Sequence, residues 1–85
     1  DRAACQRHAE TVDRIAGPFP ESEAIHQERA TAWRHVAYAF WDDPKACQQF
    51  VETVGRIAAL FPKSAAIQQE LATARRNLDL SKSDC

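Results

Sequence analysis

Residues 5–36 read CQRHAETVDRIAGPFPESEAIHQERATAWRHV, and residues 47–78 read CQQFVETVGRIAALFPKSAAIQQELATARRNL. Aligned from Cys5 and Cys47 onward, the two stretches are identical at 19 of 32 positions without a gap. Chance does not give such agreement, and a repeat of this length is typical of stacked structural units. We therefore expect two tandem units that share one fold, the first over residues 1–43 and the second over residues 44–80.

Proline and cap-forming residues divide each unit into two expected helices. A Phe-Pro pair stands in the middle of each unit, and a serine follows the proline two residues later. Proline cannot continue a helix and disfavours helical geometry in the residue before it, whereas serine is a good N-cap for the next helix. Between the units, Asp43 and Pro44 provide an N-cap and a first helical residue. The breaks fall at Pro20 with Ser22 and at Pro62 with Ser64, so the expected helices cover about residues 3–17, 22–41, 44–61 and 64–80, with a frayed tail at 81–85.

Apolar residues recur at helical spacing in these segments, at matching positions of the two units. The pairs expected in the core are Val12 with Val54, Ile15 with Ile57, and Ile25 with Ile67. Short connections make consecutive helices antiparallel neighbours. The predicted fold class is therefore all-α, with two tandem antiparallel helix hairpins. Repetition favours an α-solenoid-like stack, and a closed four-helix bundle is the alternative.

One segment of the second unit resembles a known helical repeat. Residues 62–72, PKSAAIQQELA, are similar to the opening of a tetratricopeptide repeat, which places a proline between repeats and Leu-Gly or Leu-Ala about nine residues later. Trp33 occupies the tyrosine site of that family in the first copy, and the long repeat period, from Cys5 to Cys47, is similar to the longer repeats of kinesin light chains. The resemblance implies a helical array that grips peptides or partner domains.

Composition and charge argue against several function classes. The 85 residues include 11 basic and 12 acidic side chains, without the clustered basic face that nucleic acid requires. No apolar run approaches the ~20 residues that span a bilayer. Residues 1–43 carry five basic and eight acidic side chains, a net charge of −3, whereas residues 44–85 carry six and four, a net charge of +2. This difference favours head-to-tail contact, although ordinary scatter on solvated faces also accounts for it.

Cysteine and histidine are the side chains with the most reactive chemistry. Cys5 and Cys47 begin the first and third expected helices and Cys85 follows the fourth, so an antiparallel array brings all three to one end. They are either independent thiols packed as small apolar residues, or partners in a disulfide, or zinc ligands. A disulfide needs Cα atoms within about 7 Å, which a tail residue meets most easily, so we expect any disulfide to join Cys85 to Cys47. The alternative metal set is Cys5, His8, Cys47 and Cys85; we expect no cofactor.

The sequence does not favour catalysis. The histidines at positions 8, 26 and 35 are not repeated in the second unit, and no serine, cysteine or carboxylate stands with them in the manner of a catalytic triad. Helical repeat arrays also seldom provide the enclosed pocket that an active site needs. We therefore do not expect an enzyme.

Aromatic residues gather near the end of the second expected helix. Tryptophan and tyrosine often anchor protein interfaces, although the same group can fill the core between two hairpins. Trp41 stands at a helix end and has no counterpart, so we expect it to be exposed. The predicted partner-binding residues are Trp33, Tyr38, Phe40 and Trp41.

These observations predict a protein–protein interaction module that binds a partner protein or peptide. A thin core and an exposed tryptophan also favour a homo-oligomer or a missing neighbour. The alternative is a stand-alone four-helix bundle that holds a metal through its Cys/His end.

Overall fold

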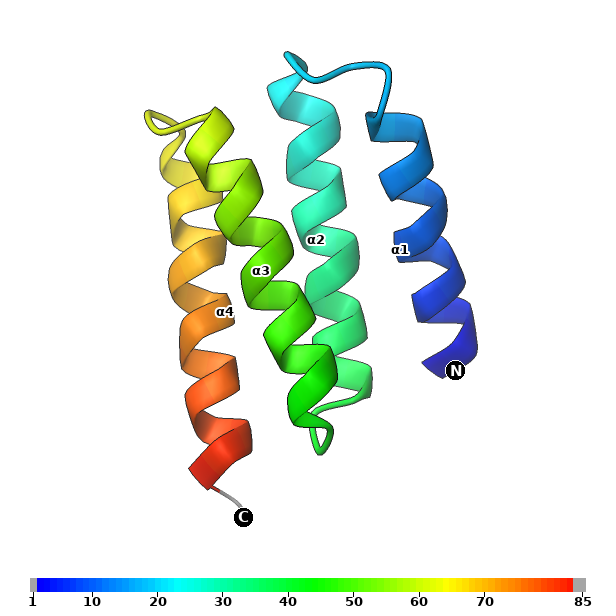
Figure 1. The fold of residues 1–85 in the computed structure, drawn as a ribbon, viewed down its shortest axis with the longest axis vertical. Helices are drawn as coiled ribbons and strands as arrows, with labels where there is room; N and C mark the ends of the chain where they lie inside the picture. The colour runs from blue at the N-terminus through cyan, green and yellow to red at the C-terminus, as the bar shows by residue number, and fades with distance from the viewer. Residues whose placement is uncertain (1, 84–85) are drawn as a thin grey trace.

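The computed structural model describes residues 2–83, with side chains described as far as residue 80. Four helices follow one another and alternate in direction, so that the start of α1 and the end of α4 lie at the same end of the molecule (Figure 1). No strand occurs in this part of the chain, which confirms the predicted all-α class. The helices are α1 (Arg2–Ala16), α2 (Glu23–Ala39), α3 (Pro44–Leu60) and α4 (Ala65–Ser83).

The predicted caps begin the later helices. The Oγ atoms of Ser22 and Ser64 accept hydrogen bonds from the backbone N–H groups of Ile25 and Ile67, at N···O distances of 3.4 and 3.3 Å. Asp43 accepts from the N–H of Lys45 at 3.0 Å, directly before Pro44 at the start of α3. Each bond satisfies one of the N–H groups that a helix start leaves without an intrahelical partner.

All three turns share one backbone pattern, which divides each repeat unit into two equal halves. In each turn the N–H of the cap residue donates to the carbonyl of a phenylalanine three residues earlier. The three bonds run from Ser22 to Phe19 (3.2 Å), from Asp43 to Phe40 (2.8 Å) and from Ser64 to Phe61 (3.1 Å). Phe40 stands midway in the sequence between Phe19 and Phe61, so each helix together with its turn occupies half of the repeat period.

The C-terminal ends of all four helices differ from the expected bounds by one to three residues, and α2 ends at Ala39 rather than at residue 41. Helix α1 stops at Ala16, before Gly17 and Pro18, because proline lacks the N–H that another turn of helix needs and disfavours helix in the residue before it. Its counterpart α3 has Ala59 and Leu60 at these positions and runs on to Leu60. Helix α4 continues to Ser83, so the part of the expected tail from 81 to 83 is helical, and residues 84–85 lie outside the described residues.

Helix α2 is the centre of the array. It packs against α1, α3 and α4, and α3 also packs against α4, whereas α1 contacts α2 alone among the described helices. A closed bundle would bring the first helix against the fourth, but Figure 1 places α1 and α4 at opposite edges. The arrangement is therefore an open stack of two hairpins. None of these helices is long and apolar enough to cross a membrane.

The expected core is complete in the second unit and incomplete in the first. Val54, Ile57 and Ile67 are fully buried, and the central cluster includes them together with residues of α1 and α2. In the first unit Val12 and Ile25 are only partly buried. Ile15 is 53% exposed, so its expected burial was wrong. The physical reason is that α3 has helices on two sides, whereas α1 has a neighbour on one side only.

Candidate protein-binding surfaces

The structure divides the aromatic group that the sequence singled out. Trp33 is 1% exposed and belongs to the core, which is the alternative place that the sequence left open for this group. Phe40 is half-buried against the same core, and the guanidinium of Arg2 lies 5.3 Å from the centre of its ring. Tyr38 and Trp41 are 50% and 56% exposed. Of the four predicted residues, only these two leave about half of the side chain exposed to a partner.

Trp33 is held by a polar network that sequence reasoning missed. One oxygen of Asp13, Oδ1, accepts from the indole Nε1 of Trp33 at 2.9 Å and from Nε of Arg29 at 2.6 Å. The network joins α1 to α2 and leaves the indole N–H with a partner in the core, as a buried polar group requires. The second unit carries Gly55, Leu71 and Arg75 at these three positions. The change of all three residues together between the two units was the sequence signal that could have indicated this network.

A hollow of about 320 Å³ lies between α2 and α4. Two half-exposed apolar residues stand at its edge, Tyr38 from α2 and Leu80 from α4. Its polar lining consists of Thr73, Arg76 and Asn77. Tyr38 and Leu80 occupy the same position in the two repeat units. The hollow is therefore bordered by equivalent positions of α2 and α4.

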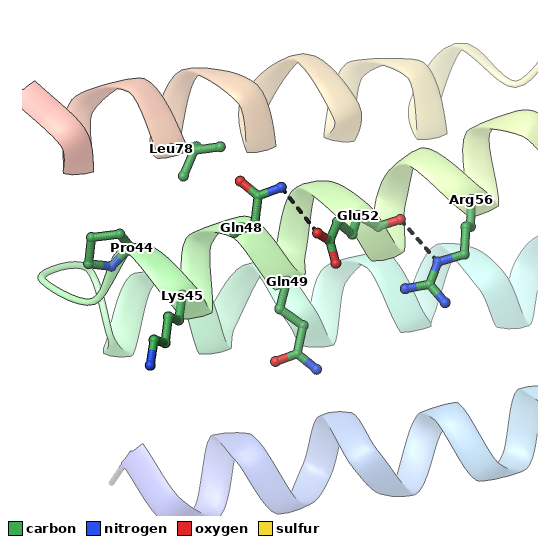
Figure 2. A pocket seen from close by; sticks show the side chains of 7 residues that line it. All are labelled: Pro44, Lys45, Gln48, Gln49, Glu52, Arg56 and Leu78. Atoms are coloured by element: carbon green, nitrogen blue, oxygen red, sulfur yellow. Dashed lines mark hydrogen bonds between the residues drawn. The ribbon is translucent and has the colours of Figure 1, made fainter.

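A second hollow, of about 540 Å³, is a shallow strip along the outside of α3. Figure 2 shows its side chains spreading out along that helix, with Leu78 alone coming from α4. The hydrogen bonds here stay within α3: Gln48 donates to the Glu52 carboxylate at 3.2 Å, and Arg56 donates to the Glu52 carbonyl at 3.4 Å (Figure 2). No group of side chains converges on one point, so this strip offers no geometry for chemistry.

The outer face of α1 is a third surface, and it is uncovered. Ala4, His8, Thr11 and Ile15 fall on one side of the helix at spacings of four, three and four residues, and all four are exposed. Their repeat equivalents in α3 are Ala46, Phe50, Thr53 and Ile57. Of these equivalents Ala46 is partly buried and the other three are buried. The face that α3 turns inward is therefore the face that α1 leaves to solvent.

One ion pair joins the two units. Nη1 of Arg34 on α2 lies 2.6 Å from Oε1 of Glu70 on α4, and both side chains are partly buried. The repeat equivalents of these residues are Arg76 and Glu28, which are both exposed. Arg34 and Glu70 thus meet where the two units join, whereas their equivalents Arg76 on α4 and Glu28 on α2 are exposed to solvent.

The cysteine and histidine end does not form a ligand cluster in the part of the chain that is described. Cys5 and Cys47 lie near the starts of α1 and α3, at one end of the molecule, and both are free thiols. Cys5 is half-buried, and Cys47 is fully buried, 3.5 Å from Nδ2 of Asn77. No three His, Cys, Asp or Glu side chains among the described residues come together as metal ligands, and His8 is exposed. Cys85, and with it the predicted disulfide, lies outside the described residues.

Comparison with protein-family models, with curated proteins and with solved structures gave no match. The similarity of residues 62–72 to a tetratricopeptide repeat therefore stays a prediction.

Proposed function

We propose that the chain is a protein–protein interaction module and that the uncovered face of α1 receives a helix or peptide from its partner. One observation carries the proposal. Ile15 and Ile57 are the same residue at the same repeat position, yet Ile15 is 53% exposed and Ile57 is fully buried. A helical array buries its apolar faces by stacking neighbours on them, so an end face with an exposed isoleucine suits another helical element.

The size and chemistry of this face support a modest, directional contact. Covering the exposed half of Ile15 is worth about 1 kcal/mol, and Phe19, which is also half exposed, lies just beyond the end of α1. Arg7 and Arg14 are exposed on one flank of the face, so charged groups border its apolar stripe.

Tyr38 and Trp41 form the second available surface, near the end of α2. Both keep half or more of the side chain exposed, and Tyr38 faces the hollow beside Arg76. This is the part of the predicted partner-binding group that burial leaves accessible, and it lies at the opposite end of α2 from the turn that contains Phe19. A partner that contacts both surfaces must span the length of that helix.

Affinity capture with a point variant tests the role of the α1 face. The tagged chain and its Ile15→Glu variant are compared for the proteins that they retain, because a buried glutamate would leave an unpaired charge in the contact. The matched control is Leu60→Glu, since Leu60 is 54% exposed but lies at the end of α3. We expect Ile15→Glu to lose a bound protein that Leu60→Glu keeps. Equal capture by both variants, with unchanged circular dichroism, would contradict the proposal.

A further inference from the structure

The junction between the two units gives the pattern for a junction between two molecules. Within one chain, α4 stacks on α2, and Arg34 of α2 meets Glu70 of α4 at 2.6 Å. Beside this pair, Ala30 of α2 is fully buried, and so small a residue lets neighbouring helices approach closely. The repeat places Arg76 and Ala72 on α4 where Arg34 and Ala30 stand on α2.

The exposed side of α4 that carries Ala72 and Arg76 therefore has the residue types that α2 uses to pack against a further helix pair. The positions by which α2 faces α4 recur one repeat later on the exposed side of α4, where Arg76 also borders the hollow beside Tyr38. Arg76 and Ala72 on this side are exposed. No hydrogen bond or ion pair joins the side chain of Arg76 to another residue in the described part of the chain. A cation thus stands at the position where the internal junction forms its ion pair.

The opposite end of the array carries the complementary residues. Glu28 on α2 is the repeat equivalent of Glu70; it is exposed, and its side chain likewise has no hydrogen bond or ion pair with another described residue. Next to α2 lies the uncovered face of α1 with Ile15, which corresponds to the inward face of α3. The two ends are thus the two halves of the contact that the molecule already makes internally.

We infer that a second copy of this chain docks head to tail, with α4 of one copy against α1 and α2 of the next, and with Arg76 paired to Glu28. The inference rests on the proposed function and names the partner for the α1 face. The net charges of the two units, −3 and +2, attract each other in this order and repel in a head-to-head order. A contact between two different surfaces stays open at both ends, so it continues into longer assemblies unless the rotation closes a ring.

Charge reversal tests this docking with the chain alone. Arg76→Glu puts two glutamates at the junction between identical copies, and Glu28→Arg puts two arginines there. In a mixture of the two variants, every junction between unlike copies again joins a glutamate to an arginine, whereas junctions between like copies still join two residues of the same charge. The double variant R76E/E28R restores opposite charges at every junction. Arg75→Glu and Glu10→Arg make the same changes of net charge at other exposed positions of α4 and α1, and they serve as controls.

Sedimentation velocity at low ionic strength gives the readout. We expect the average mass of the wild-type chain to rise above that of one copy as its concentration increases from about 1 μM to about 1 mM. Each single reversal should weaken association by at least about tenfold, because like charges meet at the junction. The equimolar mixture and the double variant should recover association, the controls should keep it, and added salt should weaken it in all associating samples.

Two results would overturn the inference. A wild-type chain that stays a single copy at about 1 mM has no such contact at useful strength. Association that Ile15→Glu abolishes but charge reversal leaves unchanged would show a symmetric contact between two α1 faces instead. In either case the capture experiment with Ile15→Glu still decides the proposed function, because it measures binding to other proteins rather than to a second copy.

Discussion

The first and second hairpins have closely similar sequences, yet their helices pack against different numbers of neighbours. The second hairpin, α3 with α4, has α2 beside it and fills its interior with apolar residues such as Phe50, Ile57 and Ile67. Among the described helices, none packs on the outer side of α1, and the first hairpin is joined by a polar network around Asp13. The comparison teaches that repeat position fixes which way a residue points, whereas the number of neighbouring helices fixes whether it is buried.

Ile15 and Ile57 give the largest expected contrast between the hairpins. Ile57→Ala should lower the free energy of unfolding by about 2–4 kcal/mol, because the change removes buried methyl groups and leaves a cavity. Ile15→Ala should lower it by less than about 1 kcal/mol, because half of that side chain is already in water. Urea unfolding followed by circular dichroism measures both variants.

This pair of variants also separates an open stack from other arrangements. If the two substitutions cost the same, α1 must be covered in solution, either by another helix of the same chain or by a second copy. Repeating the measurement at several protein concentrations distinguishes these explanations, because only a second copy makes the difference depend on concentration.

The Asp13 network gives the next largest contrast. Asp13→Ala should cost about 2–3 kcal/mol, because it leaves the buried indole N–H of Trp33 without an acceptor and removes the partner of Arg29. Asp13→Asn keeps an oxygen at this position and should cost about half as much, since only the charge is lost. Equal losses for the two variants would show that the charge, rather than the acceptor for Trp33, holds the first hairpin together.

Much of the fold could be predicted from particular residues. The two Phe-Pro pairs, the serine caps and Asp43-Pro44 set the breaks, because their chemistry acts within one turn of chain. The early end of α1 was also predictable from Gly17-Pro18. The phenylalanines of the three turns were visible in the sequence at an even spacing, but their role depends on backbone bonds that spacing alone does not specify.

The candidate surfaces were harder to predict, because they depend on contacts between distant residues. The exposure of Trp41 was predictable from its place at a helix end, but the burial of Trp33 involves an acceptor on Asp13, 20 residues earlier in the chain. The exposure of Ile15 likewise depends on the absence of contacts between α1 and the described helices other than α2. For such sites the informative signal was where the two units differ, rather than where they agree.

A histidine and a glutamine at equivalent positions provide the finest test of the comparison. Nε2 of His26 lies 3.2 Å from the carbonyl oxygen of Phe19, and Nε2 of Gln68 donates to the carbonyl of Phe61, the repeat equivalent of Phe19, at 3.4 Å. The imidazole can make its bond only if Nε2 carries the hydrogen, which leaves the buried Nδ1 without a partner among the described residues. A glutamine amide can therefore replace the imidazole as donor to the turn.

His26→Gln should then cost less than about 0.5 kcal/mol, whereas His26→Ala should cost about 1–2 kcal/mol, because the alanine removes the donor to the Phe19 carbonyl and leaves space in the core. Thermal unfolding of the two variants, measured beside the wild-type chain, checks the difference. A glutamine as costly as alanine would mean that His26 acts through its ring, whose centre lies 5.6 Å from that of Phe61, and not through the turn. In that case His26 stabilises the contact between the hairpins, and the two equivalent positions perform different tasks.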